Sequence, residues 1–196
     1  MKIGLFFGSF NPVHVGHLVL ANYMLSFTDL EEVWFIVSPQ NPLKKKKTLL
    51  DERHRLQLVR LAIDDHPKLK ANDIEFKISR PSYTTNTLAH LKEKYPHVNF
   101  TLILGADNLE NFHKWKNYEE ILNHHELYIY PRINNNASST SEALLLEKHP
   151  KVKMVDAPLL EISSTFIRNA IKDKKDVRYF MPLAVWNYVK EMHFYQ

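Results

Sequence analysis

Cysteine is absent from this chain of 196 residues, which excludes disulfide bonds and thiolate metal sites. Long hydrophobic runs are absent too, since no apolar stretch approaches the roughly 20 residues that a membrane-spanning helix needs. The first residues run straight into an apolar strand pattern and show no signal-peptide cleavage pattern. We therefore expect a cytoplasmic protein with no membrane partner.

Glycine is scarce, because only Gly4, Gly8, Gly16 and Gly105 occur. A protein uses glycine where the backbone needs a positive φ or must approach a ligand closely, so each of the four positions is informative. Three of them lie within a first strand–loop–helix pattern, and the fourth ends another apolar run.

Charge of one sign is also in short supply, since the formal net charge is only +4. A mild positive charge suits an anionic ligand but does not by itself argue for nucleic-acid binding. The proportions of 44% hydrophobic and 24% charged residues are ordinary for a globular protein. The length predicts a single domain that spans residues 1–196.

Two common phosphate-binding signatures are missing. The chain contains neither G-x-x-x-x-G-K-[ST] nor G-x-G-x-x-G. Their absence argues against a P-loop nucleotidase and against an ordinary dinucleotide-binding dehydrogenase.

What is present is an alternation of apolar runs with helical patterns. The expected strands are residues 2–7, 32–38, 73–79, 98–105, 126–130 and 151–155, and the expected helices include 15–27, 51–65, 84–94 and 183–192. Thr48 and Asp51 resemble a capping box before the second of these helices. The alternation predicts an α/β, Rossmann-like, doubly wound fold, with a mostly parallel sheet of core order 3-2-1-4-5, helices on both faces and a C-terminal helical segment.

The most informative segment reads GSFNPVHVGH, from Gly8 to His17. It joins an apolar run to a helical pattern, so His14 and His17 stand at the start of a helix. A helix start presents free backbone N–H groups and about half a positive charge, which together bind anions. A lone histidine here would more often be structural. The pair in this context favours a phosphate site whose charge can vary.

A second helix start is rich in hydroxyl groups and reads ISSTFIR, from Ile162 to Arg168. The side chains of Ser163, Ser164 and Thr165 can cap the helix, and they can also bind phosphate oxygens together with its backbone N–H groups. Arg168, about one turn further on, adds a charged donor. Alone, this pattern indicates only a well-capped helix. Together with the histidine segment, it predicts the second half of a triphosphate site.

Both segments resemble the nucleotidylyltransferase superfamily, and specifically the bacterial nicotinate-nucleotide adenylyltransferases, over nearly the whole chain. The stretch SPQNPLK, residues 38–44, resembles the loop after the second strand of that family. The stretch PSYTTNTL, residues 81–88, resembles its substrate segment. Gly105 and Asp107, followed by Trp115, resemble its segment after the fourth strand.

The resemblance implies that nicotinate mononucleotide is joined to the AMP moiety of ATP, giving deamido-NAD and pyrophosphate in NAD biosynthesis. Because the attacking group is already a phosphate oxyanion, no protein nucleophile is needed, and catalysis is positioning plus charge stabilisation. Mg²⁺ would arrive with ATP, and no dedicated protein metal site is expected.

The resemblance also implies roles for individual residues on the ATP side. His14, His17 and Arg168 are the expected catalytic residues, since they would hold the ATP phosphates. The other residues expected to contact ATP are Gly8, Ser9, Phe10, Gly16, Gly105, Asp107, Ile162, Ser163, Ser164 and Thr165.

The residues expected to contact the mononucleotide are Lys44, Thr84, Trp115, Lys116 and Arg132. The backbone N–H groups of Thr84 and Lys116 would receive the nicotinate carboxylate. Trp115 offers a flat face on which a pyridine ring can stack, although a core tryptophan is the alternative. Arg132 is followed here by Ile-Asn, where the family often has Pro-Gly, which leaves its role open. The three lysines that follow Lys44 read as a solvated loop.

Other functions stay open at this point. The acceptor could be nicotinamide mononucleotide or phosphopantetheine, and a non-catalytic nucleotide- or RNA-binding module could use the same fold. No nucleic-acid partner is expected, because the basic run has no interleaved aromatic residues on which bases could stack. The sequence leaves the oligomeric state open, a homo-oligomer included.

Overall fold

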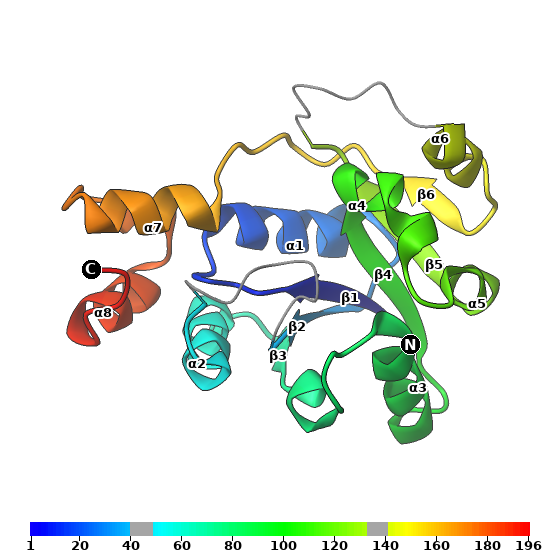
Figure 1. Cartoon of the computed structure of the whole chain (residues 1–196), viewed down its shortest axis with the longest axis horizontal. Helices are drawn as coiled ribbons and strands as arrows, with labels where there is room; N and C mark the ends of the chain where they lie inside the picture. The colour runs from blue at the N-terminus through cyan, green and yellow to red at the C-terminus, as the bar shows by residue number, and fades with distance from the viewer. Residues whose placement is uncertain (40–48, 133–140) are drawn as a thin grey trace.

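The computed structural model describes residues 1–39, 49–132 and 141–196 (Figure 1). Its centre is a sheet of six strands in the order β3-β2-β1-β4-β5-β6, and all neighbouring strands are parallel. The predicted core order is thereby confirmed, and β6 extends it. The strands are β1 (Lys2–Gly8), β2 (Glu32–Val37), β3 (Leu69–Asn72), β4 (Asn99–Gly105), β5 (Glu126–Tyr130) and β6 (Val152–Met154).

The two faces of the sheet belong to two separate hydrophobic clusters. Leu5 on β1 is level with Leu102 on β4, and both belong to one cluster, whereas the next residue along, Phe6, is level with Ile103 and belongs to the other. This alternation follows from the two-residue period of a strand. Because both faces are buried, the central strands read as continuous apolar runs, which made them recognisable from sequence.

Helices cover both faces, as predicted. Buried side chains of α1, α2, α7 and α8 join the first cluster, and those of α3, α4 and α5 join the second. The helices are α1 (Val15–Phe27), α2 (Glu52–Ile63), α3 (Thr84–Lys94), α4 (Ala106–Glu110), α5 (Tyr118–His124), α6 (Ser141–Glu147), α7 (Ser164–Lys172) and α8 (Leu183–Glu191). The 3-10 turns of the described residues are η2 (Ile74–Lys77), η3 (Phe112–Lys114) and η4 (Arg178–Phe180).

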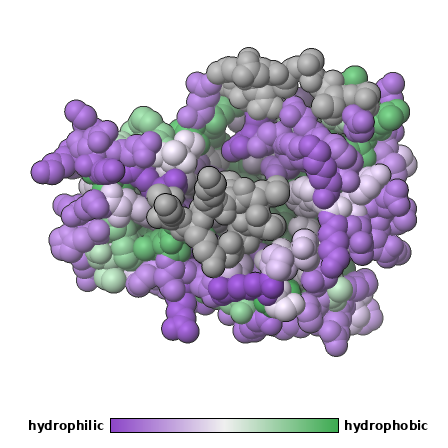
Figure 2. All heavy atoms as spheres, in the orientation of Figure 1, coloured by the Kyte–Doolittle hydropathy of each residue, from purple (hydrophilic) through white to green (hydrophobic). Residues whose placement is uncertain are grey.

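Hydrophilic side chains cover most of the face of the molecule that Figure 2 shows. Some large apolar side chains are nevertheless exposed, such as Phe27 on α1 and Tyr179 in η4. Within the described ranges, no helix combines the length and the apolar character that crossing a membrane requires.

The prediction of a strand over residues 73–79 is wrong. The third strand is the shorter β3, and the expected stretch instead forms η2. The side chain of Asn72 accepts a hydrogen bond from the backbone N–H of Ile74, which turns the chain out of the sheet. Alternating polar and apolar residues imitate a strand here, while β3 itself is a short edge strand with a weak pattern.

The expected capping box of α2 is wrong as well. Asp51 is the N-cap itself, and its carboxylate accepts a hydrogen bond from the backbone N–H of Arg53. Thr48 lies outside the described residues. The helix therefore starts one residue later than expected, at Glu52.

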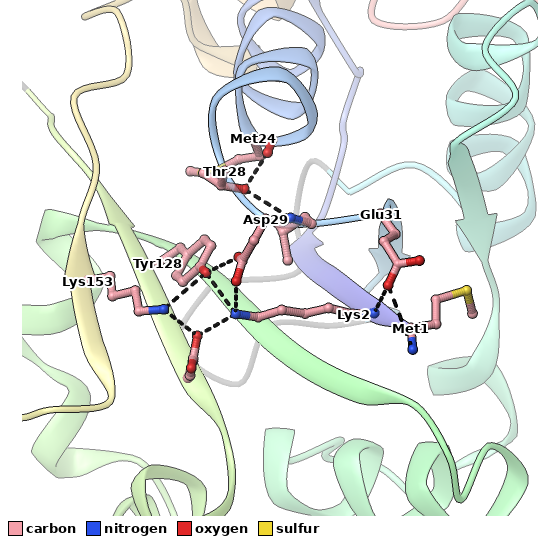
Figure 3. A network of polar contacts seen from close by, with 10 residues as sticks. Met1, Lys2, Met24, Thr28, Asp29, Glu31, Tyr128 and Lys153 are labelled. Carbon is pink, nitrogen blue, oxygen red and sulfur yellow. Dashed lines mark hydrogen bonds and ion pairs between the residues drawn. The ribbon is translucent and has the colours of Figure 1, made fainter.

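Side chains at the amino-terminal ends of the strands, which we call the amino edge of the sheet, form a network of ion pairs and hydrogen bonds (Figure 3). The Nζ atom of Lys2 donates to the carboxylates of Asp29 at 2.8 Å and Glu126 at 2.6 Å, and to the Tyr128 hydroxyl at 2.8 Å. Lys153 donates to the same Glu126 carboxylate at 3.0 Å. Burial would lower the pKa of Lys2, but the hydrogen bonds to Asp29 and Glu126 outweigh it and raise that pKa. We name this group the amino-edge network.

Candidate active site

The carboxyl-terminal ends of the strands, which we call the carboxyl edge of the sheet, carry the residues that the sequence predicts as a nucleotide site. The carboxyl ends of β1 and β4 lie side by side, at Gly8 and Gly105. From β1 the strand order proceeds through β2 to β3 on one side and through β4 to β6 on the other. Ligands of open α/β sheets bind at such a point, outside the carboxyl ends of the strands.

The loop after β1 is shaped by Gly8 and Phe10. Phe10 has a φ of 45°, and its side chain is 1% exposed. A Cβ atom on Gly8 would lie 2.7 Å from the Phe10 ring, so glycine is needed there to let the ring pack beneath the loop. The expected ATP contact of Phe10 can therefore come only from its backbone in this arrangement, because its side chain belongs to the core.

The rings of His14 and His17 stack at the start of α1, with centroids 3.7 Å apart and 28° between the planes. The backbone N–H of His14 donates to Nδ1 of His17 at 3.1 Å. Since that Nδ1 is an acceptor, the proton of the neutral His17 ring belongs on Nε2. Gly16 makes room for this pair, because a Cβ atom there would lie 3.1 Å from Nδ1 of His14.

Both histidines are held in the neutral state. Burial and, to a smaller extent, the positive charge of Arg132 together lower the pKa of His14 to about 4. Burial also lowers the pKa of His17 well below its ordinary value, and His14 and Arg132 add to the effect. Nδ1 of His14 is buried and has no hydrogen-bond partner among the described residues. At neutral pH this site therefore offers uncharged imidazole donors beside the permanent charge of an arginine.

The start of α7 lies next to the loop after β1 and is hydrogen-bonded to it (Figure 1). The hydroxyl of Ser164 donates to the carbonyl oxygen of Pro12 at 2.8 Å. Nη1 of Arg168 donates to the carbonyl oxygen of Asn11 at 2.8 Å. The structure thus brings together the two segments that the sequence predicted as halves of one site.

The remaining residues of the ISSTFIR segment shape the helix start. Ser163 is the N-cap of α7, and its hydroxyl accepts from the backbone N–H of Phe166 at 3.1 Å. The hydroxyl of Thr165 accepts from Nη2 of Arg168 at 3.2 Å. Ile162 lies against the histidine helix, 3.8 Å from the position of a Cβ atom on Gly16.

Asp107 and Arg132 form an ion pair of 3.1 Å beyond the end of β4. A Cβ atom on Gly105 would lie 2.5 Å from the Asp107 carboxylate and 3.0 Å from Cδ of Arg132, so this pair requires glycine. We expected Arg132 on the mononucleotide and Asp107 on the ribose of ATP. In this structure Arg132 contacts Asp107 and acts electrostatically on both histidines, so it lies near residues that are expected to contact ATP.

The residues expected around the nicotinate ring lie in two segments that touch. The Nζ atom of Lys116 lies 4.6 Å from the centroid of the Tyr83 ring, next to Thr84 at the start of α3. Trp115 is only partly buried, so a face of its ring can remain available to a ligand. Lys44, the last of the expected mononucleotide contacts, lies outside the described residues.

The sequence does not predict a role for Arg55, although this residue bonds several backbone segments near the site. It is 0% exposed, and its guanidinium donates to the backbone carbonyls of Ser9, Ser38, Pro39 and Leu50. The only signal in the sequence is its spacing, since it stands in phase with the buried residues of α2.

Tyr195 is a second residue without a sequence signal. Its hydroxyl donates to Oδ1 of Asn11 at 2.8 Å, and the backbone N–H of Leu50 donates to the same oxygen at 3.3 Å. The loop after β1 is thereby held from the carboxyl-terminal tail as well as from α7.

The chain is similar to known proteins in sequence and in fold. Residues 5–170 match the model of the cytidylyltransferase-like family. A curated relative from Flavobacterium johnsoniae, named probable nicotinate-nucleotide adenylyltransferase, is 55% identical over 196 residues, which is 100% of each chain. One from Bacteroides thetaiotaomicron, with the same name, is 46% identical and covers 97% of this chain and 92% of its own.

A solved structure extends the comparison to the fold. The nicotinic acid mononucleotide adenylyltransferase of Plasmodium falciparum, complexed with NaAD, matches with a TM-score of 0.78 at 22% identity. The match covers 99% of this chain and 97% of that one, and it shows a shared fold.

Proposed function

The chain belongs to the cytidylyltransferase-like family and, within it, to the nicotinate-nucleotide adenylyltransferases, and on that premise we propose how its residues carry the reaction. The enzyme joins nicotinate mononucleotide to the AMP moiety of ATP and releases pyrophosphate, in NAD biosynthesis. One observation carries the assignment of residues: the loop of His14 and His17 is bonded to the start of α7 through Ser164 and Arg168.

The triphosphate of ATP would lie between these two helix starts. The backbone N–H groups and the dipole of α1 and α7 attract phosphate oxygens. Arg168 supplies a fixed positive charge with several donors, which suits the β- and γ-phosphates. Asp107, at the end of β4, would meet the ribose, and to do so it must share its carboxylate with Arg132.

The reaction needs no proton transfer from the protein. A phosphate oxygen of the mononucleotide forms a bond to the α-phosphorus of ATP, and the bond from that phosphorus to the bridging oxygen breaks. The electron pair of the broken bond leaves with pyrophosphate. The protein contributes alignment and donors for the charge that develops.

His17 is suited to act as a neutral donor in this step. Its Nδ1 is occupied by the backbone N–H of His14, so its Nε2–H is the group that can bond an α-phosphate oxygen. A neutral imidazole needs no counter-charge in the free enzyme, where burial disfavours the imidazolium. When the triphosphate binds, its negative charge shifts the histidine equilibrium back towards protonation.

We place Mg²⁺ on the phosphates of ATP rather than in a protein cage. This ion keeps several waters and is bound mainly through substrate phosphates in many nucleotide enzymes. The described residues contain no group of three or more His, Cys, Asp or Glu side chains with the spacing of a metal site. The ion would neutralise part of the triphosphate charge.

The nicotinate end would be recognised at the start of α3. The backbone N–H of Thr84 is one of the free donors of that helix, and the amide of Lys116 lies on the neighbouring segment. Trp115 would stack on the pyridine ring. Lys44 would bind the phosphate of the mononucleotide.

The test is an assay of pyrophosphate release by the purified protein. With ATP and Mg²⁺, we expect turnover that is much faster with nicotinate mononucleotide than with nicotinamide mononucleotide or phosphopantetheine. Equal or higher specificity for the amide would overturn the acceptor assignment. A salt-steep affinity for RNA without any pyrophosphate release would instead support a non-catalytic binding module.

A further inference from the structure

Glu75 is a buried carboxyl group that the proposed reaction does not use. It lies in η2 and is 2% exposed. Its Oε1 accepts from the hydroxyl of Thr87 at 2.8 Å, and its Oε2 accepts from the hydroxyl of Ser82 at 3.2 Å. The hydroxyl of Ser38 lies close enough to act on the same carboxylate. Burial raises the pKa of Glu75, and the three hydroxyl groups oppose that rise.

A buried carboxyl group is expensive, since taking it out of water costs several kcal/mol unless its oxygens are bonded. An apolar side chain would fill the same space without that cost. The benefit of the carboxyl group is geometric, because each donor that it accepts is fixed in position.

Two of the donors flank the expected contact with the nicotinate group. Ser82 comes two residues before Thr84, and Thr87 comes one helical turn after it. Fixing both hydroxyls therefore fixes the first turn of α3 and the direction of its free N–H groups. Tyr83, which lies between them, carries the Lys116 contact that joins this turn to the Trp115 segment.

The third hydroxyl, that of Ser38, comes from the other segment assigned to the mononucleotide. Ser38 follows the last residue of β2 directly, and its carbonyl is one of the acceptors of the buried Arg55. It lies at the beginning of the SPQNPLK stretch that ends with Lys44. Glu75 thus bonds to the start of α3 and lies near the end of β2, and among the described residues it has no hydrogen bond with a residue assigned to ATP.

We propose that Glu75 is a positioning residue for the mononucleotide: it holds the start of α3 and the end of β2 at the separation that this substrate requires. The inference rests on the proposed function, because it takes the mononucleotide to bind between these segments. Glu75 acts through Thr87, Ser82 and Ser38 and makes no contact with the substrate itself.

The chain provides a matched pair of variants on α3. Thr87→Val removes a hydroxyl that Glu75 binds, whereas Thr85→Val removes a buried hydroxyl that has no partner among the described residues. Both substitutions have the same chemistry and lie two residues apart on the same helix. A difference between them therefore reports the loss of the Thr87 hydroxyl, whose bond to Glu75 at 2.8 Å is shorter than its contact with the Tyr83 carbonyl oxygen at 3.4 Å.

We expect Thr87→Val to raise KM for nicotinate mononucleotide about tenfold, as the loss of one bond to a charged group predicts. The values of kcat and of KM for ATP should stay within about twofold, and Thr85→Val should match the wild type. Glu75→Gln keeps the shape and one acceptor, so it should be much closer to the wild type in KM than Glu75→Ala.

Other outcomes would overturn the inference. If Thr87→Val lowers the melting temperature but leaves KM for the mononucleotide unchanged, Glu75 has a structural role only. If KM for ATP rises equally, the effect is not specific to the mononucleotide. A wild-type protein that neither turns over nor binds nicotinate mononucleotide in calorimetry would instead refute the proposed function, which separates the two failures. Should Glu75→Ala fail to fold, the valine pair still decides.

Discussion

Ionisable side chains are charged at the amino edge of the sheet and neutral histidines lie at the carboxyl edge. At the amino edge, Lys2 and its carboxylate partners keep their charges, because each charge has an opposite charge within hydrogen-bond distance. At the carboxyl edge, His14 and His17 lose theirs, because burial and the nearby Arg132 disfavour a second cation.

This difference in charge pairing indicates which end of the strands is suited to bind an anionic ligand. In the amino-edge network two lysines pair with two carboxylates, so the charges balance within the protein and can stabilise the fold. The carboxyl edge joins two helix starts, two uncharged imidazoles and Arg168, which has no carboxylate partner among the described residues, so an anion from outside can complete this edge. Variants at the two edges should therefore differ in which property they change.

The largest effect is expected at His17. Removal of one preorganised donor to a developing charge costs about 10²–10³ in kcat, so His17→Ala should lose about that factor. The melting temperature should change little in comparison. Steady-state kinetics and thermal unfolding measure both, and turnover close to that of the wild type would remove His17 from the mechanism.

The second effect is a pH dependence of stability that the buried histidines of the carboxyl edge should produce. Because the pKa of His14 is about 4 in the folded chain and near 6.5 when unfolded, the unfolded chain takes up the proton first as the pH falls. The free energy of unfolding should therefore drop by about 2 kcal/mol between about pH 7 and pH 5 from this group. Stability is present above the unfolded pKa and is lost towards the folded one.

His14→Asn should flatten that pH dependence. Urea unfolding at several pH values gives the slope, and the slope is the quantity to compare, since the substitution also changes packing. An unaltered slope in the variant would mean that His14 is not the group that resists protonation.

The third effect tests whether different residues of the carboxyl edge bind the two substrates. Trp115→Ala removes a stacking surface and should raise KM for the mononucleotide about tenfold, with KM for ATP unchanged. Titration of each substrate against a saturating concentration of the other measures this. If only ATP binding suffers, the stacking assignment is wrong.

The smallest effect belongs to the amino edge. Lys2→Met breaks a partly exposed network, which should cost about 1 kcal/mol of stability. The pKa values of Asp29 and Glu126 are lowered and that of Lys2 is raised, so the cost should be constant between about pH 6 and pH 9. Turnover should not change. A large loss of kcat would show that the two edges are coupled and would break the comparison.

Much of the fold could be predicted because buried parallel strands are continuous apolar runs. The pattern placed β1, β2, β4 and β5 correctly and gave α1 and α3 their observed bounds. It failed at β3, since an edge strand with one polar side has a pattern that a neighbouring 3-10 turn can imitate. Periodicity reports burial, and burial is weakest at the edge of a sheet.

The site could be predicted as far as its motifs are local. The histidine loop and the start of α7 each carry their own capping chemistry, so each was visible alone. Arg55, Glu75 and Tyr195 were not, because their partners are backbone carbonyls and hydroxyls from distant segments. A single buried polar residue among apolar ones shows no periodicity, and no neighbouring motif in the sequence indicates its role.

The bonds that fasten α7 to the loop after β1 also govern when the site can exist. They join residues 152 and 157 positions apart, and the bond from Tyr195 to Asn11 spans 184. Contacts of such long sequence separation form late, since the intervening chain must first be ordered. A chain growing from its amino terminus completes β1 and the histidines early, yet it lacks the proposed triphosphate site until α7 has emerged. Nucleotide binding is thus a property that only an almost finished chain acquires.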